Sequence, residues 1–183
     1  YSPVASYAIT SALSNTNYAI NYTGANLTIN KAPLSTTVTK VYDGTNVFTS
    51  NFTFTGTVNG DLTPSVVSGQ ATVSSKNAAS YPSFSTNTLI LDNQNYTLSG
   101  GSILASITKK PLYLNTGITV SDKTYDGGLS ATVNTSNVTA SGLVFGDVIT
   151  GVAATGSFQD KNAGNSKPVS ITNLTLYGSD ANN

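Results

Sequence analysis

Apolar and polar residues alternate along this chain in runs too short for helices. Alternation at every second position predicts strands, because successive side chains of a strand point to opposite faces. In residues 32–109 the runs are Thr37–Val41, Phe52–Phe54, Ala71–Val73, Leu89–Leu91, Tyr96–Leu98 and Ile103–Ile107. In residues 110–183 they are Leu112–Leu114, Ile118–Val120, Leu129–Val133, Leu143–Val148, Val169–Ile171 and Leu174–Leu176. Short strands separated by Gly, Asn, Asp and Pro predict an all-β fold of antiparallel, Ig-like β-sandwich units.

The composition supports strands and excludes several classes of partner. The chain has 28 Thr, 24 Ser and 20 Asn, and no Glu, Arg, His, Cys, Met or Trp, so good helix formers are scarce and we expect little or no helix. Eight Lys balance eight Asp without forming a basic stripe, which argues against nucleic acid as a partner. No apolar run approaches the roughly 20 residues that span a bilayer, so we expect no membrane insertion.

The sequence offers no catalytic machinery. It has no His, Cys or Glu, no Gly-rich phosphate loop and no Ser-x-x-Lys motif, so we expect neither an enzyme nor a cofactor. A cysteine-free chain with only 9% charged residues fits an extracellular protein of a bacterial cell surface better than a cytosolic enzyme.

Four motifs occur twice in the same order, which indicates two tandem repeats. The segment INKAPL at Ile29 matches ITKKPL at Ile107, and KVYDGT at Lys40 matches KTYDGG at Lys123. Two shorter matches follow them: NGD (Asn59–Asp61) with FGD (Phe145–Asp147), and SKNAAS (Ser75–Ser80) with DKNAGN (Asp160–Asn165). The displacements of 78, 83, 86 and 85 residues drift as loop insertions would make them.

We therefore divide the chain into a first repeat (residues 32–109) and a second repeat (residues 110–183). Residues 1–31 are predicted to be the last strands of a preceding unit, because TNYAI at Thr16 resembles QNYTL at Gln94. By the same comparison the second repeat is predicted to lack its last two strands. An alternative is that the structural boundaries are shifted from these sequence boundaries. Proline at the repeat junctions makes the links short and stiff, so neighbouring repeats are the expected partners in an elongated rod.

The recurrent Tyr-Asp-Gly motif consists of Tyr42, Asp43 and Gly44 in one copy and Tyr125, Asp126 and Gly127 in the other. Asp-Gly after an alternating strand is a strong turn signal, since glycine accepts a positive φ. We predict that the aspartate closes the turn through its side chain, while the tyrosine covers the core and bonds to the backbone through its hydroxyl.

Two functional readings of these motifs compete with the structural one. Calcium would use Asp43 with Asp61, or Asp126 with Asp147 and Asp160, although the carboxylates lack a D-x-D-x-D spacing. An isopeptide cross-link would use Lys76 with an Asn and Asp43, or Lys161 with an Asn and Asp126. The structural alternative to a cross-link is that each lysine is solvated and lies next to an asparagine that forms a turn, Asn77 or Asn162.

The motifs resemble those of YDG-type and related MBG-type repeats in haemagglutinin-like bacterial adhesins. The segments that carry the resemblance are Val41–Thr45, Thr124–Gly127, Gly146–Asp147, Asp160–Gly164, Leu176–Asn183 and, for the MBG type, Tyr18–Lys31. The first repeat departs from the pattern, with Ser75 in place of Asp160 and no match to Gly164. Such repeats occur in large filamentous secreted proteins, often exported by two-partner secretion, between an adhesive or secretion region and the cell anchor.

The resemblance implies a stalk that extends an adhesive region from the cell in attachment or biofilm formation. The alternative is a module that binds exopolysaccharide or a host-surface glycan through exposed tyrosines such as Tyr81, Tyr113 and Tyr177, since aromatic faces stack on sugars.

Overall fold

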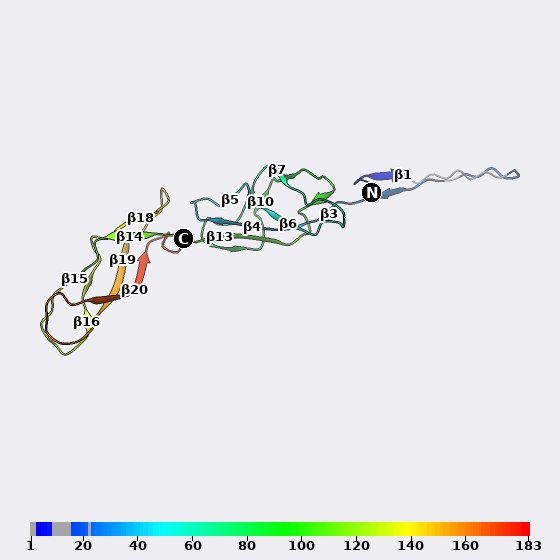
Figure 1. Ribbon diagram of the computed structural model, residues 1–183. Helices are drawn as coiled ribbons and strands as arrows, with labels where there is room; N and C mark the ends of the chain where they lie inside the picture. Colours follow the sequence, from blue (N-terminus) through cyan, green and yellow to red (C-terminus); the bar gives the residue numbers. More distant parts are fainter. Residues whose placement is uncertain (1–2, 9–15, 22) are drawn as a thin grey trace. The chain divides into compact units, whose positions relative to one another are not determined.

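The computed structural model describes residues 3–8, 16–21 and 23–183 (Figure 1). Within those residues the protein is all-β and contains no helix, as predicted. It follows that no helix of the described residues crosses a membrane. Part of the segment 1–31, predicted to end a preceding unit, lies outside the described residues.

The chain forms two compact units whose limits differ from the sequence repeats. The first unit comprises Tyr1–Thr39, Val47–Ser74 and Ser80–Ala105, and the second comprises Lys40–Asn46, Ser75–Ala79 and Ser106–Asn183. Three short segments of the first repeat thus belong to the second unit: Lys40–Asn46, which contains the first Tyr-Asp-Gly motif, Ser75–Ala79, and residues 106–109.

Up to residue 109, the described residues form thirteen short strands: β1 (Ser6–Ala8), β2 (Asn26–Thr28), β3 (Ala32–Pro33), β4 (Ser35–Val41), β5 (Val47–Phe48), β6 (Thr53–Thr55), β7 (Val66–Ser68), β8 (Ala71–Thr72), β9 (Ala79–Tyr81), β10 (Thr86–Asn87), β11 (Ile90–Leu91), β12 (Tyr96–Thr97) and β13 (Ile103–Thr108). The largest sheet has the order β6-β4-β13-β9, and a second sheet has the order β10-β8-β5. The pairs β1-β2 and β7-β11 are antiparallel, whereas β3 and β12 run parallel. The parallel pair departs from the predicted antiparallel pattern.

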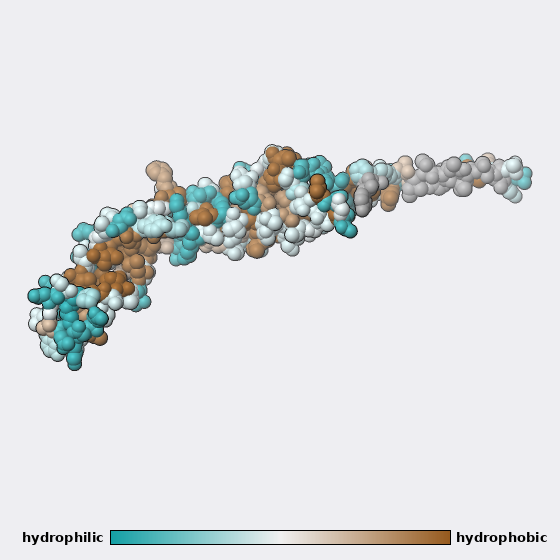
Figure 2. All heavy atoms as spheres, in the orientation of Figure 1, coloured by the Kyte–Doolittle hydropathy of each residue, from teal (hydrophilic) through white to brown (hydrophobic). Residues whose placement is uncertain are grey.

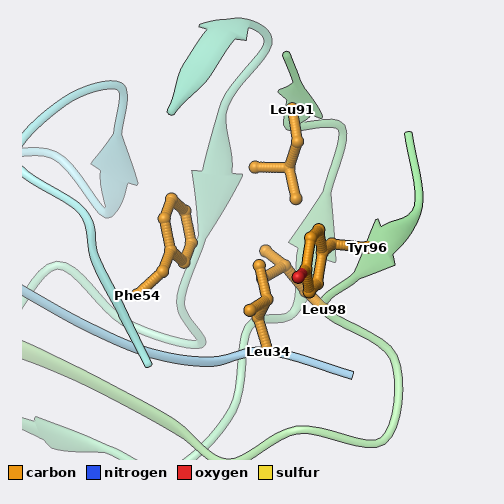
Figure 3. Close-up of a cluster of buried hydrophobic side chains, with 5 residues drawn as sticks. All are labelled: Leu34, Phe54, Leu91, Tyr96 and Leu98. Atoms are coloured by element: carbon orange, nitrogen blue, oxygen red, sulfur yellow. The ribbon is translucent and has the colours of Figure 1, made fainter. Parts of the chain in front are cut away.

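The first unit has a closed hydrophobic core (Figure 3). Leu34, Tyr96 and Leu98 point toward one another at its centre, with Leu91 and Phe54 completing the cluster. Phe52 stacks on Phe54 with ring centroids 6.2 Å apart. Burying such side chains contributes roughly 1.5–3 kcal/mol each, which offsets the entropy of ordering so many short strands.

Residues 110–183 contain β14 (Tyr113–Thr116), β15 (Thr119–Val120), β16 (Ser130–Ala131), β17 (Val133–Asn134), β18 (Thr139–Ser141), β19 (Gly151–Phe158) and β20 (Val169–Tyr177). They form a three-stranded sheet, β16-β19-β20, and two antiparallel pairs, β14-β18 and β15-β17.

The same strand pairing recurs in both repeats with matching register. Val47 pairs with Thr72 in the first repeat, and Ser130 pairs with Ser157 in the second, at displacements of 83 and 85 residues. The central strand of this sheet is β8 in the first repeat and β19 in the second. On its other side, the pairing of β8 with β10 corresponds to that of β19 with β20. The long strands β19 and β20 thus each combine two short strands of the first repeat.

The pairing of β4 with β6 recurs as that of β14 with β18. Thr36 faces Phe54, and at the matching positions Leu114 faces Ala140. The counterpart of β4 is then interrupted at Gly117, which has a φ of 97°. A Cβ there would lie 1.9 Å from the Asn137 carbonyl oxygen, so only glycine fits this break.

In the second repeat one predicted strand is wrong, and one observed strand was not predicted. The predicted strand Leu143–Val148 is instead a turn, closed by a hydrogen bond from the Asp147 amide to the Val144 carbonyl (3.1 Å), with Gly146 at φ 89°. A positive φ at the third turn residue requires glycine, and this signal outweighs the apolar alternation. Conversely, β19 was not predicted because its small Gly, Ala, Thr and Ser residues carry no apolar alternation.

Candidate functional site

The two Tyr-Asp-Gly corners share one local structure. Asp43 Oδ1 accepts hydrogen bonds from the Thr45 amide (2.9 Å) and from Lys40 Nζ (2.7 Å). In the other copy Asp126 Oδ1 accepts bonds from the Gly128 amide (2.8 Å) and Lys123 Nζ (2.8 Å). Each aspartate therefore closes its own turn through its side chain. The following Gly44 and Gly127 have φ values of 82° and 76°, which explains why both copies carry glycine.

The lysine three residues before each aspartate helps to lower the pKa of that aspartate. Burial raises the pKa of the Asp43 carboxyl, but the bonds from Lys40 and Thr45 outweigh burial and hold the pKa below its usual range. At Asp126 the bond from Lys123 is the largest cause, and the pKa is also lowered. Both corners thus carry ionised carboxylates at neutral pH, each neutralised by its own lysine.

The tyrosines of the two corners differ in environment. Tyr42 is only 3% exposed, and its hydroxyl donates a 2.6 Å hydrogen bond to Asp147 Oδ1. Burial, followed by this bond to a carboxylate, raises the pKa of the Tyr42 phenol. Tyr125 is 62% exposed. The bonding partner of Tyr42 is therefore a carboxylate and not the predicted backbone group.

Lys76 joins Tyr42 to form a four-residue cluster with Asp147 and Asp180. Lys76 Nζ lies 3.0 Å from Asp180 Oδ1 and 3.4 Å from Asp147 Oδ1. The side chains of Asp147 and Asp180 are 6% and 8% exposed, whereas that of Lys76 is more open to solvent. The bond to Asp180 raises the pKa of the Lys76 ammonium, so the lysine stays charged. We call these four residues the carboxylate cluster, and all of them lie in the second compact unit.

Local structure fixes both carboxylates of the cluster. Asp147 ends the Val144–Asp147 turn, and Asp180 follows β20. Asp180 Oδ2 accepts a 3.0 Å bond from the Val148 amide, and this bond, followed by that from Lys76, lowers the pKa of Asp180 to about 2. The cluster is thus built on two carboxylates, one held by a backbone amide and both in contact with Lys76.

Asparagine side chains extend the cluster. The Ala78 amide donates to Asn183 Oδ1 (3.0 Å), and Asn183 Nδ2 lies 3.5 Å from Asn77 Oδ1. The segment that contains Lys76 therefore contacts the residues after β20 twice, through the hydrogen bond from the Ala78 amide to Asn183 and through the ion pair of Lys76 with Asp180.

The structure does not assemble the predicted isopeptide groupings. Lys76 lies beside Asp147 and Asp180, while Asp43 is bound by Lys40. In the second repeat Asp126 is bound by Lys123, and Lys161 has no ion pair among the described residues. The Asn162 amide instead donates to Asp160 Oδ1 (2.8 Å).

The predicted calcium ligands are likewise engaged elsewhere. Asp61 accepts a 2.5 Å bond from the Tyr96 hydroxyl, and Asp160 forms an ion pair with Lys167. Within residues 3–8, 16–21 and 23–183 no three acidic side chains gather into a group that could hold a metal ion.

Sequence reasoning missed the pairing of Asp180 with Lys76. Asp180 belongs to the L-x-G-x-D-A-N-N ending of the second repeat, and the available signal was its likeness to the D-N-Q-N turn at Asp92. Asp92 likewise accepts a bond from a backbone amide, that of Ser65 (3.0 Å). Tyr81, predicted to be exposed, is buried, because it ends β9 on the core side of its sheet.

Residues 108–183 match the family model of the YDG domain, which confirms the YDG-type resemblance of the second repeat. The match covers fewer than half of the 183 residues. No curated protein and no solved structure matches the chain.

Proposed function

We propose that this chain is a structural part of the stalk of a large bacterial cell-surface adhesin, in which tandem β-sandwich repeats extend an adhesive region from the cell. The observation that carries the proposal is the carboxylate cluster. In it, Tyr42 and Lys76 of the first repeat hold two carboxylates of the second repeat, Asp147 and Asp180.

This arrangement gives the recurrent motif a mechanical use. Both motifs that supply the cluster, Tyr-Asp-Gly and Lys-Asn-Ala, recur in the second repeat at Tyr125 and Lys161. A motif that joins one repeat to the next must be present in every repeat, whereas a catalytic motif needs only one copy. The family match to a YDG domain and the resemblance of Tyr18–Lys31 to an MBG-type unit support the same proposal.

Small-angle scattering of the whole chain tests the stalk role. The proposal predicts an elongated particle whose maximum dimension is retained in the double variant Tyr125→Phe and Lys161→Met, which leaves the carboxylate cluster intact. In the matched double variant Tyr42→Phe and Lys76→Met the scattering should report a broader range of dimensions. A compact, near-spherical profile for the unchanged chain contradicts the proposal.

A glycan-binding module is the second candidate. Tyr113 and Tyr177 are both more than half exposed, and exposed aromatic rings stack on sugar rings. Binding of an exopolysaccharide that is lost in Tyr113→Ala or Tyr177→Ala, and kept in Tyr18→Ala, supports this function. Absence of binding across a glycan array rules it out.

A further inference from the structure

An asparagine lies three residues after an aspartate at matching places in the two repeats. The pairs are Asp92 with Asn95 and Asp180 with Asn183, in the segments D-N-Q-N and D-A-N-N. Each aspartate accepts a 3.0 Å hydrogen bond from a backbone amide of its own repeat. The aspartate thus fixes the D-x-x-N segment locally and places the asparagine that ends it.

The side chains of both asparagines accept a backbone amide from the residues that precede their repeat. Asn183 Oδ1 accepts a bond from the Ala78 amide (3.0 Å), and Asn95 Oδ1 accepts one from the Val4 amide (3.1 Å). Ala78 belongs to the first repeat, and Val4 belongs to the segment before it. In both cases the donor is a main-chain group that every residue except proline has, so the bond does not depend on the donor's side chain.

The main chain of the same asparagines binds the segment that enters the repeat. The Ala32 amide donates to the Asn95 carbonyl (2.9 Å), and the Lys110 amide donates to the Asn183 carbonyl (3.3 Å). Ala32 and Lys110 are matching residues of the INKAPL and ITKKPL junctions. Each asparagine therefore connects the entry of its own repeat to the residues before that repeat. We call the asparagine with its two amide donors a joint, the first at Asn95 and the second at Asn183.

The carboxylates beside the two joints are bound differently. At the second joint the carboxylate cluster adds side-chain bonds from the Tyr-Asp-Gly and Lys-Asn-Ala motifs of the first repeat. At the first joint the matching carboxylates bind their own repeat, because Asp61 accepts a bond from the Tyr96 hydroxyl (2.5 Å) and Asp92 accepts one from the Ser65 hydroxyl (2.7 Å). Residues 1–31 contain no Tyr-Asp-Gly motif. The additional bonds thus accompany the motifs of the preceding unit, whereas the asparagine bonds occur with and without them.

Both joints are polar. Apolar residues such as Ile171 and Leu174 gather at the surface over β19 and β20 (Figure 2), but no residue of these strands supplies a joint bond. A joint made of hydrogen bonds to the main chain does not require apolar side chains of matching shape in the preceding unit.

We propose that the D-x-x-N asparagine is the general joint residue of these repeats, and that its partner is any preceding unit that presents a backbone amide to it. The carboxylates add selectivity, because only a preceding unit with the tyrosine and lysine of the two motifs binds them. Such a repeat can therefore follow a unit of unlike sequence through the asparagine alone. The inference deepens the proposed stalk function and rests on it for the role of a joint.

The test compares Asn95→Ala and Asn183→Ala in the full chain by hydrogen exchange of the Val4 and Ala78 amides. The Val4 amide should exchange about two- to tenfold faster in Asn95→Ala, as the loss of one hydrogen bond implies, while the Ala78 amide is unchanged. Asn183→Ala should show the reverse. The Ile29 amide, which donates to the Ala5 carbonyl (2.9 Å), and the amides of β19 are the internal measures of folding.

Three matched variants separate the joint bond from other effects. Asn182→Ala changes the exposed neighbour of Asn183 and should leave the Ala78 amide unchanged. Asn95→Asp keeps the accepting oxygen, so the Val4 amide should stay protected. Val4→Thr changes only the donor's side chain, and the amide should stay protected there as well.

The double variant Tyr42→Phe and Lys76→Met tests the selective part of the joint. It should speed exchange of the Ala78 amide and leave that of the Val4 amide unchanged, because the first joint has no bond from these motifs. Faster exchange of Val4 in this variant or in Val4→Thr overturns the proposal. So does unchanged exchange of both amides in the two alanine variants while the internal measures stay protected.

If an alanine variant does not fold, the unchanged chain provides the test through NMR scalar coupling across the hydrogen bond. Coupling between the Val4 amide nitrogen and the side-chain carbonyl carbon of Asn95, and between Ala78 and Asn183, supports the joint, and its absence overturns it. An elongated scattering profile without these bonds overturns the joint alone, whereas a compact profile with them contradicts only the stalk.

Discussion

The phenol of Tyr42 donates a 2.6 Å hydrogen bond to Asp147, a residue 105 positions further along the chain. Asp147 also receives Lys76, which in turn reaches Asp180. The Tyr-Asp-Gly motif thus has two roles. Its aspartate closes a local turn, and its tyrosine binds a carboxylate that is distant in the sequence.

Removing the Tyr42 hydroxyl should destabilise the protein. Tyr42→Phe removes the shorter of the two bonds to the nearly buried Asp147 carboxylate and leaves only that from Lys76 at 3.4 Å, so we expect the free energy of unfolding to fall by roughly 1–3 kcal/mol. Tyr125→Phe is the matched control, and its exposed ring predicts a change within about 0.5 kcal/mol. Urea unfolding measures both variants, and equal effects would show that the two corners have equivalent environments.

Alanine in place of the corner glycine should destabilise the protein more at Gly44 than at Gly127. Alanine at a positive φ costs roughly 1–2 kcal/mol at either Gly44 or Gly127. At Gly44 the added Cβ would also lie 2.8 Å from Val144 Cγ1, whereas nothing lies within 4 Å at Gly127. Gly44→Ala should therefore lower the melting temperature more than Gly127→Ala, and the reverse order would contradict the contact with Val144.

Asp180 should give the cluster a defined pH dependence. Its pKa in the folded protein is about 2, below the ordinary value of 3.8, so its contribution is fully present above about pH 4 and is lost as pH falls toward 2. The difference in melting temperature between the natural chain and Asp180→Asn should be constant from pH 7 to about 4 and shrink below it. A difference that instead changes between pH 5 and 7 would point to another titrating group.

Truncating a core leucine should lower the free energy of unfolding more in the first repeat than at the matching position of the second. Leu34 is completely buried, and Leu34→Ala should cost roughly 2–5 kcal/mol in the unfolding of the first unit. Leu112 occupies the matching position in the second repeat but is only partly buried, so Leu112→Ala should cost about 1 kcal/mol. Denaturant unfolding followed by NMR resolves the two units, and a similar loss for both leucines would mean that the second core is as closed as the first.

Local features of this fold were predictable from the sequence, but long-range ones were not. The all-β class followed from the alternation, and the turn at Asp43 followed from Asp-Gly after a strand. The strand predicted at Leu143–Val148 was wrong because a glycine at positive φ outweighs apolar alternation. Nothing in the spacing of Tyr42 and Asp147 indicates their contact, since it depends on the packing of segments 105 residues apart.

The parallel pairing of β3 with β12 was missed for a related reason. Short strands reveal their apolar faces but not the direction of their partners, and Ala32 reaches Asn95 and Tyr96 only through the tertiary fold. The strand pairings that do recur, such as β5-β8 and β16-β19, lie between motifs that the two sequence repeats share.

A double-mutant cycle on Tyr42 and Asp147 tests the central claim most directly. The variants are Tyr42→Phe, Asp147→Asn and the two combined, with the free energy of unfolding measured for each. The account predicts a coupling of roughly 0.5–3 kcal/mol between the two changes, because both act on one nearly buried hydrogen bond. Strictly additive effects would show that the Tyr-Asp-Gly tyrosine does not hold Asp147 in solution, and the structural role of the cluster would be contradicted.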